Sequence, residues 1–383
     1  MNPQVWSQNK MKRRQFFKTA GGISLVAGSG IEPLLMNLYA FEEKANLSKV
    51  EALYYKKHSD REIECLLCPR YCKLGDKERG YCGVRENMGG TYYTLVYGKA
   101  CSINVDPIEK KPFFHFLPGT NAFSIATAGC NVNCKFCQNW EISQVRPEQV
   151  EHYDIPPSKV VDLAKKYGCP SIAYTYTEPI IFYEYMYDTS KEARIKGIKN
   201  TVVTGGHINP EPLEELTKVV DAIKIDLKAF TQDFYTSYVR GELQPVLDAI
   251  KIAHKSNVWL EIVYLVIPTL NDSPNEIQNL CRWIMNEIGP DVPLHFSRFF
   301  PMYLMKNLPH TPLSTLEKAY KIALAEGLHY VYLGNIPNHR AESTYCPKCK
   351  NKVIQRIGYQ IGKIELKEGK CKFCSNPIPG VWT

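Results

Sequence analysis

From residue 157 to residue 333, short apolar runs of β-forming residues alternate with longer segments of helical pattern. This order predicts an α/β fold with a parallel sheet and outer helices, because parallel strands need long crossover connections. The β-type runs are residues 171–176, 201–204, 222–226, 259–266, 294–299 and 329–333. The helix-like segments are residues 157–167, 180–195, 212–220, 245–254, 274–288 and 315–325. A further run at residues 122–126 gives about seven strands, enough for a partial barrel of the (β/α)6 type.

Polar or glycine residues follow several of these runs, at the strand ends where such barrels carry their chemistry. They are Glu178, Gly205, Gly206, His207, Asp226 and Lys228. A carboxylate can bind an ammonium group, and paired glycines let the backbone approach a ligand closely. Each feature also has a structural alternative: an acid capping the next helix, a turn histidine without a role, or an internal Asp–Lys ion pair.

Two further charged residues lie within the β-type runs. Glu261 would be costly to bury unpaired, so we expect it to line the lumen of the barrel. Strand alternation places His295 and Ser297 on one face and Arg298 on the other, where Arg298 could pair with a carboxylate.

Eleven of the 14 cysteines fall into three clusters, and only Cys101, Cys169 and Cys281 stand alone. Such close spacing indicates metal or iron–sulfur ligation rather than disulfides. The central cluster is Cys130, Cys134 and Cys137, and Gly129 permits a sharp turn just before it. Three thiolates on one loop can hold three irons of a [4Fe–4S] cube and leave the fourth iron open. The alternatives are a zinc loop, which would need a fourth ligand, or three reduced core cysteines.

The spacing C-x3-C-x-aromatic-C, with Phe136 as the aromatic residue, resembles the cluster motif of the radical S-adenosylmethionine (SAM) superfamily. The resemblance implies that Cys130, Cys134 and Cys137 hold a [4Fe–4S] cluster. It also implies that the open iron takes the amino and carboxylate groups of SAM.

The resemblance extends to the strand ends. In the family, the second strand ends in a Gly-Gly-Glu-Pro-like turn that holds the SAM amino group. Here Tyr176-Thr177 replaces the glycines and Glu178-Pro179 is kept, which weakens backbone contacts but leaves the carboxylate role available. Asp226-Leu-Lys228 resembles a stretch of the pyruvate-formate-lyase-activating branch. The implied SAM-binding residues are Glu178, Gly205, Gly206, His207, Asp226 and Lys228.

The other two cysteine clusters each contain four thiols. Cys65, Cys68, Cys72 and Cys82 follow the spacing C-x2-C-x3-C-x9-C, which fits zinc or a second cluster, or free thiols in a loop-rich lobe. Cys346, Cys349, Cys371 and Cys374 form two C-x2-C pairs beside β-rich residues 352–358 and 363–366. This second spacing is typical of a zinc ribbon, and a rubredoxin-like iron site would use the same sulfurs.

The N-terminus resembles a twin-arginine export signal, with Arg13 and Arg14 followed by Phe16, Lys18 and a glycine-rich apolar run. The run is too short and too rich in glycine for a stable transmembrane span, although an uncleaved anchor fits the pattern. The first forty residues carry +4 of the net charge of +8. The modest remaining charge does not indicate nucleic-acid binding. Export to the periplasm or cell envelope is predicted if the signal is used, and a cytoplasmic location if it is not.

The sequence therefore predicts four parts: a signal segment (1–40), a connector with a cysteine-rich lobe (41–120), a partial barrel (121–340) and a zinc-ribbon-like module (341–383). Within the second part, residues 41–62 read as a charged helical connector and residues 91–105 as a hairpin. The stretch with Asp106, Glu109, Lys110, Lys111 and His115 reads either as a solvated linker or as a substrate-facing lip.

Several motifs in order resemble the radical SAM enzyme of the AmmeMemoRadiSam system, which is related to pyruvate-formate-lyase activases. The resemblance covers about residues 60–383 and implies an electron-donor protein and AMMECR-type and Memo-like partners. It implies reductive cleavage of SAM to a 5′-deoxyadenosyl radical that abstracts hydrogen from an unidentified substrate. Two alternatives are glycyl-radical activation of a partner protein and a non-catalytic iron–sulfur carrier or metal scaffold.

Overall fold

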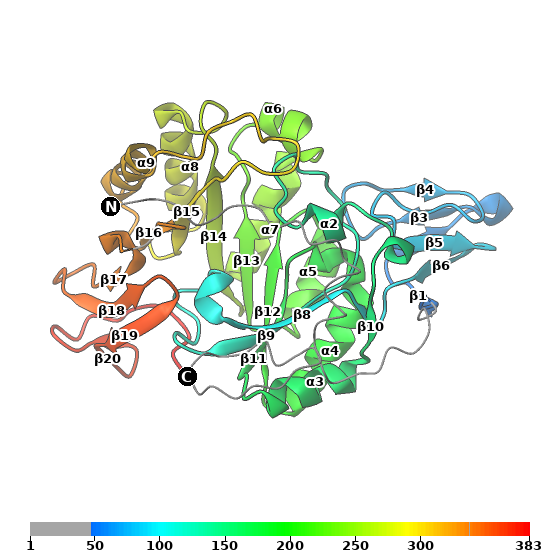
Figure 1. Ribbon diagram of the computed structural model, residues 1–383, viewed down its shortest axis with the longest axis horizontal. Helices are drawn as coiled ribbons and strands as arrows, with labels where there is room; N and C mark the ends of the chain where they lie inside the picture. Colours follow the sequence, from blue (N-terminus) through cyan, green and yellow to red (C-terminus); the bar gives the residue numbers. More distant parts are fainter. Residues whose placement is uncertain (1–46, 337) are drawn as a thin grey trace, which may run out of the picture. The chain divides into compact units, whose positions relative to one another are not determined.

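The computed structural model describes residues 47–336 and 338–383, so the signal-like segment lies outside the described residues. Its central feature is an eight-stranded sheet in the order β16-β15-β14-β13-β12-β11-β9-β8 (Figure 1). The strands are β8 (Ser102–Pro107), β9 (Asn121–Ala126), β11 (Ser171–Tyr174), β12 (Lys199–Thr204), β13 (Ala222–Asp226), β14 (Trp259–Val266), β15 (Leu294–Arg298) and β16 (Val331–Gly334). Strands β9 to β16 of this sheet run parallel, and β8 is antiparallel to β9. The predicted α/β partial barrel is confirmed.

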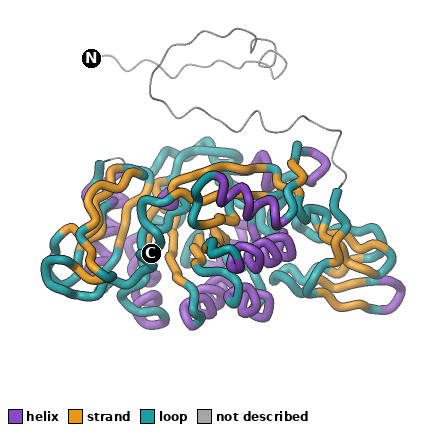
Figure 2. Tube along the Cα trace, turned by 90° about the horizontal axis from the view of Figure 1, so that it is seen from below, coloured by secondary structure: helices purple, strands orange, loops and turns teal. Residues whose placement is uncertain are grey.

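Helices connect the parallel strands, as the alternating pattern predicts. They are α2 (Trp140–Ser143), α3 (Pro157–Lys166), α4 (Tyr183–Ile195), α5 (Pro210–Thr217), α6 (Gln232–Phe234), α7 (Leu243–Lys255), α8 (Pro274–Glu287) and α9 (Leu313–Ala325). Proline occupies the first turn of α3, α5 and α8, where its missing N–H has no partner to lose. In Figure 2 most of the helices lie on one side of the strands. In the part of the chain that the structure describes, no helix is long and apolar enough to cross a membrane.

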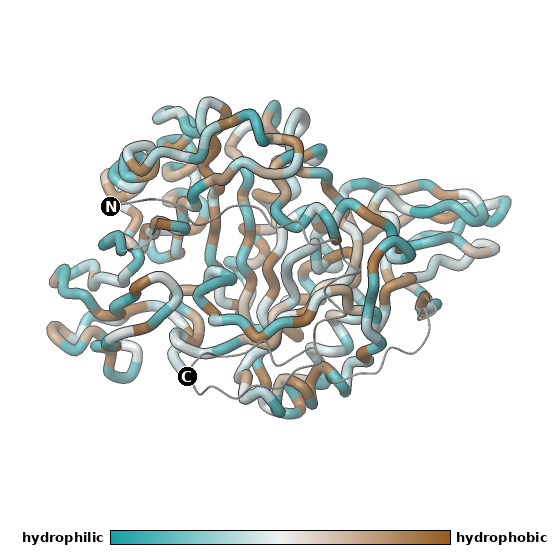
Figure 3. Tube along the Cα trace, in the orientation of Figure 1, coloured by the Kyte–Doolittle hydropathy of each residue, from teal (hydrophilic) through white to brown (hydrophobic). Residues whose placement is uncertain are grey.

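The apolar core lies between this sheet and its helices, and Figure 3 shows hydrophobic residues along the central strands. The inner face of the sheet is different because it carries charged side chains. Glu261 is completely buried, and its carboxylate accepts hydrogen bonds from the backbone N–H of Phe114 (2.9 Å) and His115 (2.8 Å) and from the Trp259 indole (3.0 Å). His295 Nε2 lies 2.6 Å from the same carboxylate. These partners offset the cost of burial and confirm that Glu261 lies inside.

Three expectations for residues 41–118 are wrong or need changing. The helical connector predicted for residues 41–62 is wrong for the part that the structure describes. That part contains strands β1 (Val50–Glu51) and β2 (Tyr55–Lys57) and a short 3-10 helix at Ser59–Arg61. These strands pair with neighbours in the cysteine-rich lobe, so pairing overrides the helical propensity of the charged residues.

The hairpin predicted within 91–105 is also wrong. Strand β6 (Thr91–Thr94) pairs instead with β5 (Arg85–Met88), through a turn at Gly89 and Gly90. Both glycines have positive φ, as a two-residue hairpin turn requires. Strand β8 leaves that lobe and pairs with β9 at the edge of the main sheet.

The stretch from Asp106 to His115 is not a solvated linker, because its Asp106, Glu109, Lys111 and His115 side chains are buried. Lys111 donates a 2.6 Å bond to Asp106, and the Tyr176 hydroxyl donates to the same carboxylate. His115 lies 2.6 Å from the Tyr332 hydroxyl on β16. The residues between β8 and β9 therefore fill the inside of the open barrel.

The C-terminal residues form a small β module with β17 (Thr344–Tyr345), β18 (Lys352–Ile357), β19 (Gln360–Ile364), β20 (Leu366–Lys367) and β21 (Lys370–Cys371). Its core joins Cys346 and Cys371 to Phe114 and Tyr332. Arg356 of β18 is buried and donates a 2.5 Å bond to the Phe114 carbonyl. The residues that fill the barrel thus also anchor this module.

Replacing Glu261 with alanine should leave several buried N–H groups without an acceptor. We expect the free energy of unfolding to fall by about 3–5 kcal/mol, as for other broken buried ion pairs. The measurement is the denaturant midpoint of the anaerobic holoprotein. The control is Glu287→Ala at an exposed position of α8, which should change stability by no more than about 0.5 kcal/mol. Equal midpoints for the two variants would contradict the structural role of Glu261.

Candidate functional site

The three central cysteines lie on the loop that follows β9, and neighbouring elements hold this loop by its backbone. Its N–H groups donate to carbonyls of α2 and of the segment after β13: Gly129 to Ile142, Asn133 to Val239, and Lys135 to Tyr238, each at 2.9 Å. The Asn131 side chain donates a 2.7 Å bond to the His207 carbonyl after β12. The loop is therefore fixed at the carboxyl ends of the strands.

Gly129 is required by both conformation and space. Its φ is +94°, in the region that favours glycine. A Cβ at this position would lie 2.6 Å from the Cys82 carbonyl oxygen and 2.6 Å from Val84. The sharp turn predicted before Cys130 is confirmed, and the cysteine-rich lobe packs directly against it.

The three thiols share an apolar environment. Burial raises the pKa of Cys130 well above its usual value and that of Cys134 to about 12, although Lys228 acts on Cys134 in the opposite direction. The Cys137 sulfur lies 3.2 Å from the Ser143 hydroxyl. Metal ligation needs thiolates, so a positively charged centre must stabilise them here. Three soft sulfur donors on one loop fit an iron–sulfur cluster with one open iron.

The turn after β11 is bound to the cysteine loop. Tyr176 has φ +67°, a conformation that a glycine would adopt without strain, and its carbonyl accepts a 2.7 Å bond from Asn139. The Thr177 hydroxyl donates a 2.8 Å bond to the Thr127 carbonyl. The Tyr176 carbonyl and the Thr177 hydroxyl therefore attach this turn to the cysteine loop.

Glu178 is buried beside Cys130, and its charge raises the pKa of that thiol. One carboxylate oxygen accepts a 2.6 Å bond from the Thr204 hydroxyl, and the other a 2.8 Å bond from the Gly205 N–H. It also caps the next helical turn by accepting from the Ile180 N–H at 3.2 Å, so the structural alternative is present. Burial raises the pKa of Glu178, and its hydrogen-bond donors act against that rise.

The two glycines after β12 are needed for different reasons. A Cβ on Gly205 would lie 3.2 Å from the Glu178 carboxylate, so a side chain there would crowd it. Gly206 has φ +73°, and its Cβ would lie 3.0 Å from Ile225 on β13. His207 follows, and it is buried with both ring nitrogens lacking a hydrogen-bond partner within the described residues. Burial lowers the pKa of His207 to about 4, so the ring is neutral at physiological pH.

Asp226 and Lys228 at the end of β13 form the predicted ion pair, with Lys228 Nζ 2.9 Å from the carboxylate. Lys224, which lies two residues earlier on β13, donates to the same carboxylate. The two lysines hold the pKa of Asp226 well below its usual value, against the effect of burial. Lys228 and Asp226 also interact electrostatically with Cys134, which places the pair next to the cysteine loop.

The hydrogen bond that the Arg298 side chain makes does not involve Glu178, Asp226 or the cysteine loop. Arg298 lies at the end of β15, and its Nε donates a 2.8 Å bond to the Thr311 carbonyl. Strand alternation predicted that Arg298 lies on the face opposite His295 and Ser297. Its hydrogen bond to Thr311 agrees with that prediction.

Several residues near the site could not be singled out in advance. Asn131, Asn139 and Thr204 have no charge and no spacing signal, yet they connect the cysteine loop to the ends of β11 and β12. Their only sequence signal is position: two lie inside or just after the cysteine motif, and one is the last residue of a strand.

The comparisons with known proteins agree with this geometry. The model of the radical SAM superfamily matches residues 124–284, which include the cysteine loop and the ends of β11, β12 and β13. An uncharacterized protein of Methanocaldococcus jannaschii is 44% identical over 330 residues, covering 86% of this chain and 98% of that protein. The chain belongs to the radical SAM superfamily. Enzymes of this superfamily use a [4Fe–4S] cluster and SAM, and the chain is an enzyme of this type.

Two more distant relatives are activating enzymes. A putative glycyl-radical enzyme activating enzyme of Methanocaldococcus jannaschii is 24% identical over 223 residues, covering 57% of this chain and 80% of that protein. The pyruvate formate-lyase-activating enzyme of Clostridium pasteurianum is 23% identical over 161 residues, covering 41% of this chain and 67% of that enzyme. The similarity to activating enzymes, predicted from Asp226-Leu-Lys228 and the cysteine motif, is confirmed.

Gly129→Ala should displace the cysteine loop, because the new Cβ would clash with the Cys82 carbonyl. We expect the variant to lose most of the iron of the central cluster after anaerobic reconstitution, measured by iron and sulfide analysis. Gly168→Ala is the matched control: Gly168 also has positive φ, but nothing lies within 4 Å of its Cβ position. Full cluster content in Gly129→Ala would show that the close contact is not required.

Proposed function

We propose that this radical SAM enzyme cleaves SAM reductively and abstracts hydrogen from a substrate held above the strand ends. When bound, the cluster supplies one electron that breaks the sulfonium C–S bond of SAM, giving methionine and a 5′-deoxyadenosyl radical. The observation that carries the proposal is the buried Glu178 carboxylate at the end of β11, which accepts from the Gly205 N–H and whose neighbour Thr177 bonds to Thr127 at the start of the cysteine loop.

The residues of the chain have distinct roles in this proposal. Cys130, Cys134 and Cys137 hold the cluster, and Glu178 receives the amino group of SAM. Gly205 and Gly206 let the backbone approach SAM closely. His207, with two unpartnered ring nitrogens, is available to SAM or the substrate as a neutral group.

Asp226 and Lys228 would orient SAM near Cys134. They would not transfer protons, because each holds the other in its charged form. Their pair also places a cation beside a thiolate ligand, which favours the deprotonated sulfur. Glu178 and His207 are buried, and burial of these groups would keep water away from a reactive radical.

The direct test is the formation of 5′-deoxyadenosine when the anaerobically reconstituted protein is reduced in the presence of SAM. The wild-type protein should form it, and the triple variant Cys130→Ala/Cys134→Ala/Cys137→Ala should not. The control variant Cys281→Ala, at a lone buried cysteine, should retain activity. If the wild-type protein has an intact cluster and binds SAM but forms no product, the chain acts as an electron carrier or scaffold instead.

The proposed role of Glu178 can be measured separately by titrating SAM into the reconstituted protein. Glu178→Gln keeps the size of the side chain but removes its charge, and we expect the dissociation constant for SAM to rise about 10- to 100-fold, the value of a charged hydrogen bond. Thr204→Val removes only the hydroxyl that supports Glu178 and should have a smaller effect. Unchanged affinity in Glu178→Gln would leave the residue with its capping role alone.

A second candidate function is glycyl-radical activation of a partner protein, and the similarity to activating enzymes favours it. In this case the hydrogen would come from a backbone glycine of the partner. Electron paramagnetic resonance of a candidate partner after turnover should then show a glycyl radical. Candidate partners are the AMMECR-type and Memo-like proteins that the sequence resemblance implies, and a low-potential electron-donor protein is required for either reaction.

We further propose that Cys346, Cys349, Cys371 and Cys374 hold one tetrahedral metal ion, zinc or iron, with a structural role. Within residues 47–336 and 338–383, these four cysteines form a group that could hold a metal ion, and their ligand atoms all lie within 4.8 Å of one another. Two sulfur pairs, Cys346–Cys374 and Cys349–Cys371, are 3.6 Å apart. A tetrahedral ion with metal–sulfur bonds of about 2.3 Å requires sulfur pairs about 3.8 Å apart, which is close to this spacing.

A further inference from the structure

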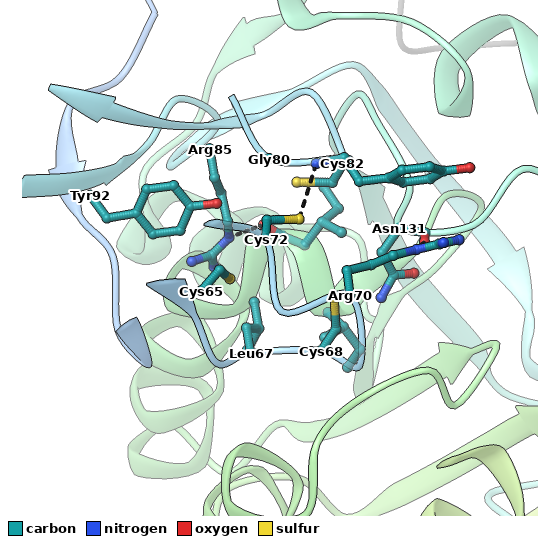
Figure 4. Close-up of a pocket in the computed structure, with 13 residues that line it drawn as sticks. Cys65, Leu67, Cys68, Arg70, Cys72, Gly80, Cys82, Arg85, Tyr92 and Asn131 are labelled. Carbon is teal, nitrogen blue, oxygen red and sulfur yellow. Dashed lines mark hydrogen bonds between the residues drawn. The ribbon is translucent and has the colours of Figure 1, made fainter. Parts of the chain in front are cut away.

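The four thiols of the cysteine-rich lobe surround one pocket. Cys65, Cys68, Cys72 and Cys82 all line it, as Figure 4 shows. Cys65 ends strand β3 (Ile63–Cys65), and Cys68, Cys72 and Cys82 lie outside the strands, so the lobe brings together residues that are up to 17 positions apart in the sequence.

The arrangement of these thiols differs from that at the C-terminus. They are not among the described groups whose ligand atoms all lie within 4.8 Å of one another, so their sulfurs are more widely spaced than those at the C-terminus. The spacing C-x2-C-x3-C-x9-C also lacks the two paired knuckles of a zinc ribbon. Four separated sulfurs around a shared pocket instead suit a multi-iron cluster, in which each thiolate binds a different iron.

The wall of the pocket carries polar atoms that lack partners. Arg85 is 1% exposed, and one of its guanidinium nitrogens bonds to Glu184 at 2.5 Å, while its Nη1 has no hydrogen-bond partner within the described residues. The side-chain amide oxygen Oδ1 of Asn131, on the opposite side of the pocket, is also buried and has no hydrogen-bond partner in the described part of the chain. A buried cation beside four thiols would stabilise the negative charge of a thiolate-bound cluster.

The pocket also lies directly against the central cysteine loop. Asn131, which lines it, follows Cys130 in the chain. The Cys82 carbonyl occupies the space where Gly129 has no side chain, and Arg70 donates a 2.9 Å bond to the Asn131 carbonyl. One short stretch of backbone therefore separates the two sets of thiols.

From these observations we propose that Cys65, Cys68, Cys72 and Cys82 hold a second iron–sulfur cluster that passes electrons to the central one. A low-potential one-electron protein donor, of the ferredoxin or flavodoxin class, reduces the second cluster by one electron and is itself oxidised. The second cluster returns to its oxidised state when that electron moves to the central cluster, so no further reactant is needed. The relay role rests on the proposed SAM cleavage, whereas the presence of the cluster does not.

The presence of the cluster is tested first, on the anaerobically reconstituted full chain. The triple variant Cys130→Ala/Cys134→Ala/Cys137→Ala should retain about four irons and four sulfides, apart from any single ion at the C-terminus. Adding Cys72→Ala and Cys82→Ala to it should remove them, and adding Cys101→Ser, at a lone cysteine, should not. Zinc in place of iron and sulfide at the lobe would overturn the proposal.

A spectroscopic measurement on the wild-type protein needs no variant to fold. After reduction, electron paramagnetic resonance should show two cluster signals, of which SAM changes only one. A single signal in a protein with full iron content would contradict a second cluster. This outcome is independent of whether the central cluster cleaves SAM.

The relay is tested with Cys72→Ala in the 5′-deoxyadenosine assay, using two reductants. With dithionite, which reaches the central cluster directly, the variant should keep most of its activity. With a reduced flavodoxin as donor, the variant should lose most of its activity, and Cys101→Ser should not. Equal loss with both reductants would assign the lobe a structural role only, and no loss with flavodoxin would exclude the relay.

Discussion

The open barrel depends on the pairing of charges that the inner face of its sheet buries. Glu261 on β14 is satisfied by backbone N–H groups, an indole and His295, and Asp226 on β13 lies between two lysines. An isolated charge at the fully buried Glu261 would cost several kcal/mol, whereas Asp226 is partly exposed. The segment between β8 and β9 supplies backbone donors to Glu261, and Asp106 at the end of β8 accepts a hydrogen bond from Tyr176. The interior is thus polar, ordered and connected to the strand ends.

This organisation fixes the candidate site through a small number of contacts between turns. The end of β11 is attached to the cysteine loop by Thr177 and through the Tyr176 carbonyl, and to the end of β12 by Glu178. The cysteine loop in turn contacts the lobe that carries four more thiols. Because these contacts are buried, the three regions hold one another in place without a large mobile element. In the two proposals, electrons would enter through this lobe and SAM would be held at the ends of β11 and β12.

Much of the main sheet was predictable, because its strands are apolar, short and separated by helices that begin with proline or a capping residue. The lobe was not: the charged residues before Ile63 have helical propensity, but they pair as strands beside the cysteines. The hairpin error has a related cause, since β6 and β8 look alike in sequence but find partners in different sheets. The β5–β6 pairing has a local signal in Gly89 and Gly90, whereas β8 and β9 are separated by residues 108–120 and have no two-residue turn between them.

The sequence by itself determined the superfamily and the residues of the candidate site. The thiol spacing, the Glu178-Pro179 turn and the paired glycines are local patterns, which the proposed function assigns to a cluster and SAM. Only the tertiary structure decided which groups stand together: Glu178 beside Cys130, Lys228 beside Cys134, and Cys82 against Gly129. The physical reason is that a ligand motif needs only a short stretch of chain. The burial, charge and close contacts that tune its thiols come from elements up to about a hundred residues away, which meet only when the sheet closes.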